Sequence, residues 1–239
     1  MRAMITRAEP GATRTADALK ARGIDTIITP FLTIREADSI SVDLTRVQAL
    51  VFTSPNGVRA WARLRPERKP TAWCVGDATE QAAIEAGFAK TRSAGGDIDA
   101  LVERLKAGLE PESGALLHVR GAHTAGDLSG TMMRHGYHVQ EAIAYRADAP
   151  PILPSTARDA LKSLTVSAVL FHSPRTAAAF TALVEDAELN MALKGMIAVA
   201  ISPNAAANLI AADWAAVRVA ETPDEAALLD RVGAGPRNP

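Results

Sequence analysis

The stretch Leu50–Trp61, LVFTSPNGVRAW, has a counterpart at Val169–Phe180, VLFHSPRTAAAF. Each stretch begins with two apolar residues and Phe, reaches Ser-Pro after one variable residue, and continues into a helical segment that ends in an aromatic residue. A short apolar run indicates a buried strand, and Ser followed by Pro is typical of a helix N-terminus. The two stretches therefore predict two strand–turn–helix units of the same design.

The segments that follow each copy also correspond. Residues 72–88, AWCVGDATEQAAIEAGF, and residues 197–214, IAVAISPNAAANLIAADW, each read as a strand, a turn of small residues and an Ala-rich helix. Short strands alternate with helices of about ten residues along the whole chain, which is the pattern of parallel sheets. We expect an α/β fold with two similar parallel-sheet domains that carry helices on both faces. Among the finer expectations are helices over 123–135 and 204–211 and a strand over 139–144.

Two extended, polar or proline-rich segments, 33–43 and 144–154, belong to neither copy and bracket one complete copy. In the simplest topology the chain starts in one domain, crosses into the second and returns, so that the two crossings lie side by side as a two-stranded hinge. We therefore predict a discontinuous domain of residues 1–34 and 153–239, a second domain of 43–143, and a hinge of 35–42 and 144–152.

Composition excludes several classes of function. The 239 residues carry 26 Lys and Arg against 27 Asp and Glu, a net charge of −1, so the whole protein does not attract nucleic acid or an anionic membrane. A single Cys excludes an internal disulfide framework. No run approaches the 18 or so apolar residues of a membrane span, and the first residues, MRAMITRAEPGATRT, lack the apolar core of a signal peptide. We expect a cytoplasmic protein with neither nucleic acid nor membrane as partner.

Four turns connect a predicted strand to a predicted helix, at residues 53–57, 76–79, 173–176 and 202–204. Such turns cap helices, but the free N–H groups of a helix start also bind carboxylates or phosphates. Ligands of parallel sheets sit at this strand edge. Both interpretations stay open for each turn, and four turns facing a shared cleft would favour anion binding.

Other candidate residues leave alternatives of the same kind. Arg120 lies at the end of the strand LLHVRG, where it would pair with a ligand carboxylate or else be solvated or paired within the protein. His118, in the same strand, would lie in the cleft or else pack within the protein. Tyr145, one of two tyrosines, follows the run EAIA before the second hinge segment, as a catalytic phenol or as a packing residue. Cys74 lies in an apolar strand and reads as core rather than nucleophile.

Metal and nucleotide chemistry lack their usual motifs. Four histidines lie between residues 118 and 138, but without a zinc-site spacing, so no metal is expected. The chain has no GxGxxG after its first strand, no GxxxxGK[ST] and no GxSxG. Dinucleotide binding, P-loop hydrolysis and α/β-hydrolase catalysis are therefore not expected.

Together the segments resemble the uroporphyrinogen-III synthase family over nearly the whole chain. The matching segments are ITRAEP, TPFLTI, VFTSPNGV, VGDAT, LLHVRG, GYHVQEAIAYRA, LFHSPRTAAAF and AISPNAAANL. The resemblance implies two α/β domains joined by a two-stranded linker, the first built from both chain ends. It also implies an enzyme without cofactor that cyclises hydroxymethylbilane, a linear tetrapyrrole with eight carboxylates. The product is uroporphyrinogen III, formed with inversion of ring D and loss of water.

The resemblance also implies site residues, with Tyr145 as the candidate catalytic acid. The implied substrate-binding residues are Arg7, Thr53, Ser54, Asn56, Gly57, Gly76, Ala78, Thr79, Arg120, Gly121, Ser173, Pro174, Ser202 and Asn204. Where many relatives carry Gly-Pro-x-Thr, this chain has Ser202-Pro203-Asn204-Ala205, so that Ser202 or Asn204 would replace the threonine. The alternative function is a two-domain module that closes on a small anion without chemistry. In either case we expect a monomer.

Overall fold

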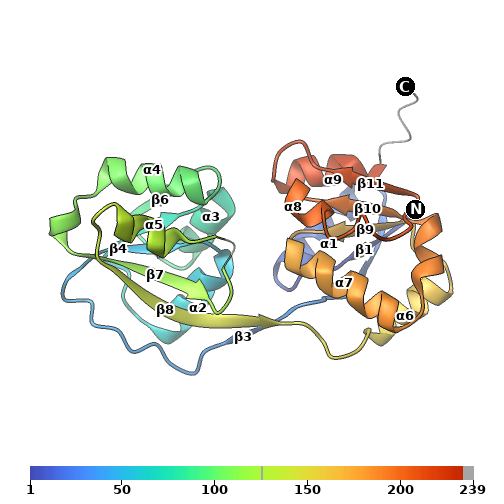
Figure 1. Ribbon diagram of the computed structural model, residues 1–239, viewed down its shortest axis with the longest axis horizontal. Coiled ribbons are helices and arrows are strands. Elements are labelled where there is room, and N and C mark those ends of the chain that lie inside the picture. Colours follow the sequence, from blue (N-terminus) through green and yellow to red (C-terminus); the bar gives the residue numbers. More distant parts are fainter. Residues whose placement is uncertain (125, 234–239) are drawn as a thin grey trace. The chain divides into compact units, whose positions relative to one another are not determined.

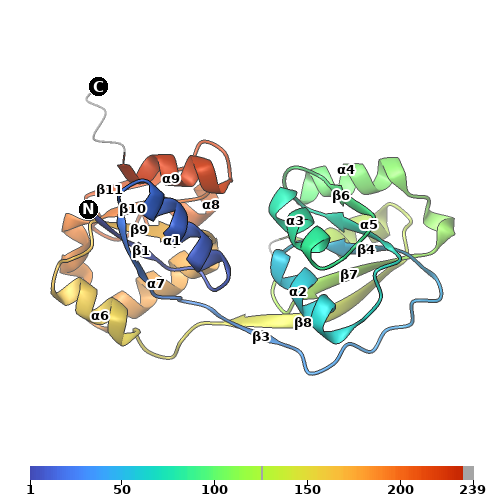
Figure 2. The same cartoon turned by 180° about the vertical axis from the view of Figure 1, so that it is seen from behind.

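The computed structural model describes residues 1–124 and 126–233. The chain divides into two compact units. Unit 1 comprises Met1–Thr33 and the chain from Asp148 onward, and unit 2 comprises Ile34–Ala147. Figures 1 and 2 show the elements of each unit from opposite sides. The predicted α/β class is confirmed, with two mainly parallel sheets.

Unit 1 is built on a parallel sheet of five strands in the order β11-β10-β9-β1-β2. The strands are β1 (Arg2–Ile5), β2 (Asp25–Ile28), β9 (Ala168–Phe171), β10 (Ile197–Ala200) and β11 (Ala216–Val219). One face packs on α1 (Gly11–Ala21) and α9 (Glu225–Gly233). The other packs on α6 (Ser155–Lys162), α7 (Pro174–Asp186), α8 (Pro203–Ala206) and the 3₁₀ helix Asn190–Gly195.

Unit 2 has a sheet of six strands in the order β3-β8-β7-β4-β5-β6. The strands are β3 (Thr33–Glu36), β4 (Val47–Phe52), β5 (Thr71–Cys74), β6 (Thr91–Ser93), β7 (Ala115–Gly121) and β8 (Val139–Asp148). One face packs on α2 (Pro55–Leu64) and α3 (Asp77–Glu85). The other packs on α4 (Ile98–Gly108) and α5 (Leu128–Arg134), and the 3₁₀ helix Pro111–Ser113 precedes β7.

Five strands have the same spatial order in both sheets, in agreement with the sequence repeat, and β3 is an additional strand of unit 2. The order β11-β10-β9-β1-β2 of unit 1 corresponds to β6-β5-β4-β7-β8 of unit 2, with the Ser-Pro strands β9 and β4 in the middle. In unit 1 the neighbouring strands β9 and β1 are followed by helices that pack on opposite faces of the sheet, and in unit 2 the same holds for β4 and β7. Such a switch point leaves a crevice at the carboxyl ends of the strands, where ligands of this fold class bind.

Three predicted element boundaries are wrong. The helix expected over 123–135 begins only at Leu128, because Asp127 accepts the N–H of Gly130 at 2.8 Å and caps it there. The helix expected over 204–211 ends at Ala206, after which the Asn208 side chain donates to the Asn204 carbonyl oxygen. The strand expected over 139–144 continues to Asp148 as β8, because β3 pairs alongside it.

The division between the units falls close to the predicted hinge segments. The chain passes between units at residues 33–34 and again at 147–148. Beside the pairing of β3 with β8, the N–H of Ala37 donates to the carbonyl oxygen of Ala144 at 2.9 Å. Both segments are therefore partly tied into the sheet of unit 2. That residues 35–42 and 144–152 act as a hinge stays a prediction.

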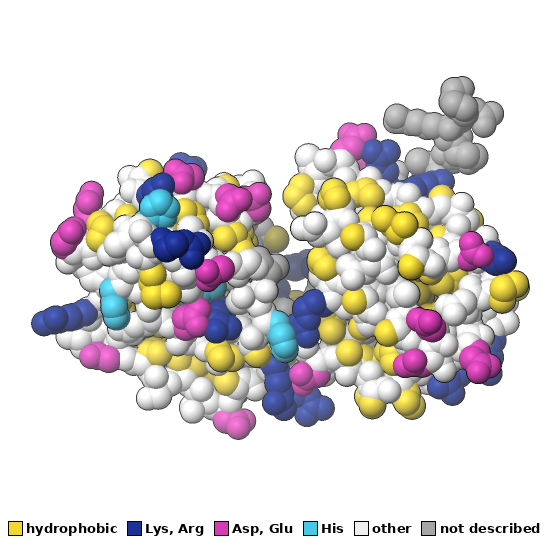
Figure 3. Space-filling view, in the orientation of Figure 1, with side chains coloured by type: hydrophobic (Ala, Val, Ile, Leu, Met, Phe, Trp, Pro, Cys, Tyr) yellow, Lys and Arg dark blue, Asp and Glu magenta, His cyan; other side chains and the backbone are white. Residues whose placement is uncertain are grey.

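The surface carries charges of both signs. On the face in Figure 3, acidic and basic side chains are scattered over each unit. Among the described residues, no helix combines the length and apolar character needed to cross a membrane.

Candidate functional site

The predicted substrate-binding residues lie at or just beyond the carboxyl ends of strands in each unit, whereas Tyr145 lies within β8. In unit 2 they follow β4 and β5 and end β7, and in unit 1 they follow β1, β9 and β10. The residues that follow β4 and end β7, and those that follow β9 and β1, flank the switch point of their unit, and the turns after β5 and β10 lie one strand further away. The sites are described for each unit by itself.

The three Ser-Pro turns cap helices. Ser54, Ser173 and Ser202 each have extended backbone, and each side-chain oxygen accepts a backbone N–H one turn into its helix, at 3.2, 3.2 and 3.3 Å. Pro at the first helical position has no N–H to leave unpaired. Because each serine oxygen acts as an acceptor in its capping bond, its hydroxyl hydrogen is not used there. The hydroxyls of Ser173 and Thr176 also lie 2.8 Å apart, and either of them can donate to the other. The turns thus cap helices and still carry donors for an anion.

The turn between β5 and α3 is built differently. Gly76 precedes the helix without a capping side chain, and its carbonyl oxygen accepts the N–H groups of Thr79 and Glu80 at 3.0 Å. Thr79 is 3% exposed. Thr79 is therefore buried, whereas the neighbouring Ala78 is exposed.

Gly57 has a packing role that the sequence alone does not reveal. A Cβ atom at Gly57 would lie 2.8 Å from the carbonyl oxygen of Val119. Real side chains do not approach so closely, so only glycine lets α2 pack this closely on β7. Asn56, beside it, accepts a hydrogen bond from Arg59 at 3.1 Å.

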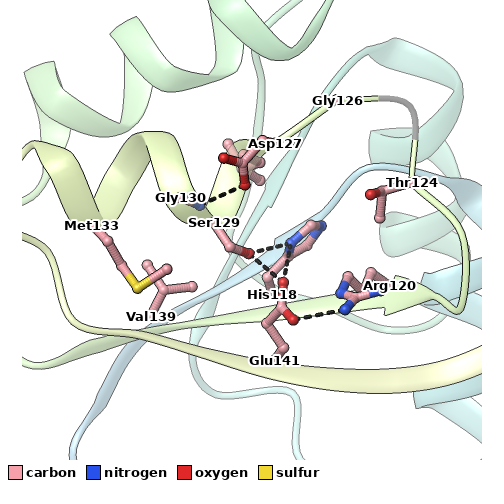
Figure 4. Close-up of a pocket in the computed structure, with 11 residues that line it drawn as sticks. His118, Arg120, Thr124, Gly126, Asp127, Ser129, Gly130, Met133, Val139 and Glu141 are labelled. Atoms are coloured by element: carbon pink, nitrogen blue, oxygen red, sulfur yellow. Dashed lines mark hydrogen bonds and ion pairs between the residues drawn. The ribbon is translucent and has the colours of Figure 1, made fainter.

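The switch point of unit 2 holds a chain of hydrogen bonds around His118 (Figure 4). The imidazole is 3% exposed. Its Nε2 lies 3.2 Å from Thr53 Oγ1, and its Nδ1 lies 3.1 Å from Ser129 Oγ. Burial lowers the pKa of His118 to about 4, against the opposing pull of Glu141, so the ring is neutral at pH 7.

Arg120 is paired within the protein. Its guanidinium donates to Glu141 at 2.7 Å and to the Gly121 carbonyl oxygen at 2.9 Å. The hydrogen bond from Arg120 lowers the pKa of Glu141 and keeps that carboxylate ionised. A ligand carboxylate would therefore have to compete with Glu141 for this cation.

These groups line one side of a pocket of about 430 Å³ between α5 and strands β7 and β8 (Figure 4). Sequence reasoning missed Ser129 and Glu141. Glu141 is directly opposite His118 in the register of β7 and β8. A glutamate inside the strand segment VQEAIAY was the available signal, but its partner depends on the register.

The switch point of unit 1 also holds a partly buried ionic cluster, around Glu225. This carboxylate accepts hydrogen bonds from Arg7 at 2.8 Å and from Thr15, and it lies 3.2 Å from His172 Nε2. Burial alone would raise the pKa of Glu225, but the contacts with His172, Thr15 and Arg7 outweigh it and hold the pKa at about 2. Arg7 is thus engaged within unit 1. Sequence reasoning missed Glu225, His172 and Thr15.

Tyr145 lies within β8 and packs on Gly121, its register partner on β7. A Cβ atom at Gly121 would lie 2.8 Å from the Tyr145 ring, so glycine makes room for it. The ring lines a second pocket of unit 2, of about 600 Å³, with Ala122, Ile143 and Arg146. In the part of the chain that the structure describes, no hydrogen bond of the phenol hydroxyl is found.

Two further predictions concern Cys74 and metal. Cys74 is fully buried in the core of unit 2, and burial raises the pKa of its thiol to about 12, so it is not a thiolate nucleophile. Within residues 1–124 and 126–233, no group of three or more His, Cys, Asp or Glu is placed to hold a metal ion.

Comparison with known proteins identifies the family. A family model described as "Uroporphyrinogen-III synthase HemD" matches residues 13–230. The chain belongs to the uroporphyrinogen-III synthase HemD family.

Solved structures with the uroporphyrinogen-III synthase fold agree with this membership. The enzyme from Helicobacter pylori 26695 shares 20% identity over 97% of this chain and 98% of its own, with a TM-score of 0.66. A variant enzyme from Thermus thermophilus, an extremely thermophilic bacterium, shares 17% identity over 97% of both chains, with a TM-score of 0.58. Comparison with curated proteins gives no significant match. At these identities the structures establish the uroporphyrinogen-III synthase fold for this chain.

Proposed function

We propose that the protein is a uroporphyrinogen-III synthase, which cyclises hydroxymethylbilane to uroporphyrinogen III with inversion of ring D and loss of water. Membership of the HemD family supports this activity. The observation that carries it is the Tyr145 phenol, which packs on Gly121 and lines a pocket with its hydroxyl unengaged among the described residues. The proposed enzyme works in the cytoplasm, as a monomer and without cofactor.

Tyr145 would act where water leaves. The terminal C–O bond of the substrate breaks, the hydroxyl departs as water after receiving a proton, and the remaining electron-poor carbon is attacked by a ring-D pyrrole carbon. A bond of the resulting spiro intermediate then breaks, and the macrocycle closes with ring D inverted. The final step releases a proton, which balances the proton consumed when water left. A phenol O–H aimed at the departing oxygen stabilises that first step. The remaining acceleration would come from holding the two ends of the linear tetrapyrrole in the geometry that leads to inversion of ring D.

The substrate carboxylates would be bound mainly by backbone N–H groups and hydroxyls at the strand-end turns. This proposal includes the hydroxyls of Ser54 and Ser202, the hydroxyl pair of Ser173 and Thr176, and the turns around Gly76 and Asn204. Arg7 and Arg120 already bind Glu225 and Glu141. They would contribute only where a substrate carboxylate replaces the internal one.

The test supplies freshly generated hydroxymethylbilane and identifies the uroporphyrin isomer after oxidation. We expect type III to exceed the spontaneous background, in which closure without inversion dominates. Stable binding of unchanged substrate with only background isomer would instead establish the anion-binding module.

The variant Tyr145→Phe removes one hydroxyl and keeps the ring on Gly121. Because a general acid contributes about 10²–10⁴-fold, we expect kcat for type III formation to fall at least about 100-fold while the melting temperature stays near the parent's. Unchanged kcat would reduce Tyr145 to a packing residue. Tyr137→Phe is the matched control, since that phenol donates to the Leu109 carbonyl oxygen on the opposite face of the sheet.

A further inference from the structure

The positions of the protons in the hydrogen-bond chain of unit 2 follow from which of its groups can donate and which can only accept. The chain runs from Glu141 through Ser129 and His118 to Thr53, with contacts of 2.6, 3.1 and 3.2 Å (Figure 4). An ionised carboxylate only accepts hydrogen bonds. Arg120, at 2.7 Å on the other carboxylate oxygen, keeps Glu141 ionised. The Ser129 hydroxyl must therefore donate to Glu141.

The tautomer of His118 follows from that first donor. A serine hydroxyl has one hydrogen, so Ser129, having donated it to Glu141, can only accept from His118. Nδ1 therefore carries the imidazole proton. The buried neutral ring then has an unprotonated Nε2, which accepts the hydroxyl hydrogen of Thr53.

We propose that His118 is a positioning residue that holds the hydroxyl hydrogen of Thr53, so that Thr53 meets the substrate as an acceptor of a pyrrole N–H. Thr53 is partly exposed, at the carboxyl end of β4 on the switch point. Because the Thr53 hydroxyl donates its hydrogen to His118, only the lone pairs of Thr53 Oγ1 can face a ligand. These lone pairs accept hydrogen bonds and repel a carboxylate. This proposal rests on the proposed tetrapyrrole substrate, and it replaces carboxylate binding as the role of Thr53.

The first arm of the test reads the tautomer directly. The whole protein is labelled with ¹⁵N-histidine, and the His118 ring nitrogens are assigned by their loss in His118→Gln. We expect a neutral Nδ1–H ring at pH 7 that persists to pH 5. An Nε2–H tautomer or a cationic ring at pH 7 overturns the proposal, whether or not the protein makes uroporphyrinogen III.

The second arm uses a matched pair of variants. The amide of His118→Asn can replace Nδ1 but does not reach Thr53, whereas the longer His118→Gln places an amide oxygen near the former Nε2. Losing one neutral hydrogen bond costs about 0.5–1.5 kcal/mol, up to about tenfold. We expect kcat/KM for type III formation to fall about tenfold in His118→Asn and in Thr53→Val, and to stay within about threefold in His118→Gln and Thr53→Ser.

The double variant separates positioning from packing. If His118 acts through Thr53, His118→Asn causes no further loss in a Thr53→Val background. An additional tenfold loss there, or equal losses in His118→Asn and His118→Gln, overturns the proposal. If the tautomer is as expected but only background isomer forms, the proposed function fails and, with it, the pyrrole as the group that meets Thr53.

Discussion

At the scale of single residues, each switch point joins a histidine, a glutamate, an arginine and a hydroxyl. In unit 2 these are His118, Glu141, Arg120 and Ser129, and in unit 1 they are His172, Glu225, Arg7 and Thr15. In both clusters the arginine stands at the end of the strand beside the Ser-Pro strand. Both ion pairs are only partly buried, and each carboxylate accepts further hydrogen bonds from its own unit besides that of the arginine. The clusters therefore fix local geometry at the crevices where a ligand is expected.

His118 makes the stability of unit 2 depend on pH. Its folded pKa, about 4, lies below the ordinary value of 6.5. As the pH falls from 6.5 toward 4, the unfolded chain binds a proton that the folded protein excludes, so stability falls with pH in this window. Linkage gives a loss of about 2–3 kcal/mol at pH 4.5 relative to pH 7.

Urea unfolding of the parent and of His118→Gln at both pH values measures this contribution. We expect the variant to lose about 2–3 kcal/mol less on acidification. Burial also lowers the pKa of His172, so part of the pH dependence remains in both proteins. Identical pH dependence in parent and variant would contradict a neutral, buried His118.

At the scale of secondary-structure elements, the turns that open the helices decide where functional groups lie. These turns could be predicted because a capping serine, its proline and the preceding apolar run are contiguous in sequence. The partners of Arg7 and His118 could not be predicted, because they depend on the packing of α9 and on the register of β7 with β8. For the same reason the sequence missed the continuation of β8 alongside β3.

The close packing of α2 on β7 is an element-scale prediction. In Gly57→Ala the new methyl group would lie 2.8 Å from the Val119 carbonyl oxygen, so the helix must shift. We expect a loss of about 1–3 kcal/mol of unfolding free energy. Gly195→Ala is the matched control, because nothing lies within 4 Å of its added atom. Equal stability of the two variants in denaturant unfolding would show that α2 tolerates the displacement.

At the scale of the whole molecule, the two units share the order of five strands, but one is built from a continuous segment and the other from two separate segments. Unit 2 is continuous, whereas unit 1 needs residues 1–33 to supply β1 and β2 beside β9. Each sheet is covered on both faces by helices of its own unit. The repeat in the sequence made this duplication predictable.

Because each unit has its own hydrophobic core, we expect the two units to fold independently. We expect a fragment of residues 34–147 to show native-like circular dichroism and a cooperative unfolding transition. Deletion of residues 1–33 should abolish the transition of unit 1 and leave that of unit 2, because β1 lies between β9 and β2. A fragment 34–147 that stays unfolded would show that unit 2 depends on unit 1.

The near-neutral charge of the chain bears on how the whole molecule would hold a substrate with eight carboxylates. With a net charge of −1, and with Arg7 and Arg120 engaged by internal carboxylates, affinity would come mainly from oriented N–H and hydroxyl groups. Such binding depends less on salt than binding in an arginine-lined cleft.

The most direct measurement is the isomer ratio of uroporphyrinogen formed from hydroxymethylbilane as protein is added. The account predicts that the type III fraction rises from the spontaneous background toward completion with increasing protein, and that Tyr145→Phe at the same concentrations stays near background. A ratio that remains at background at every concentration of the folded parent protein would contradict it.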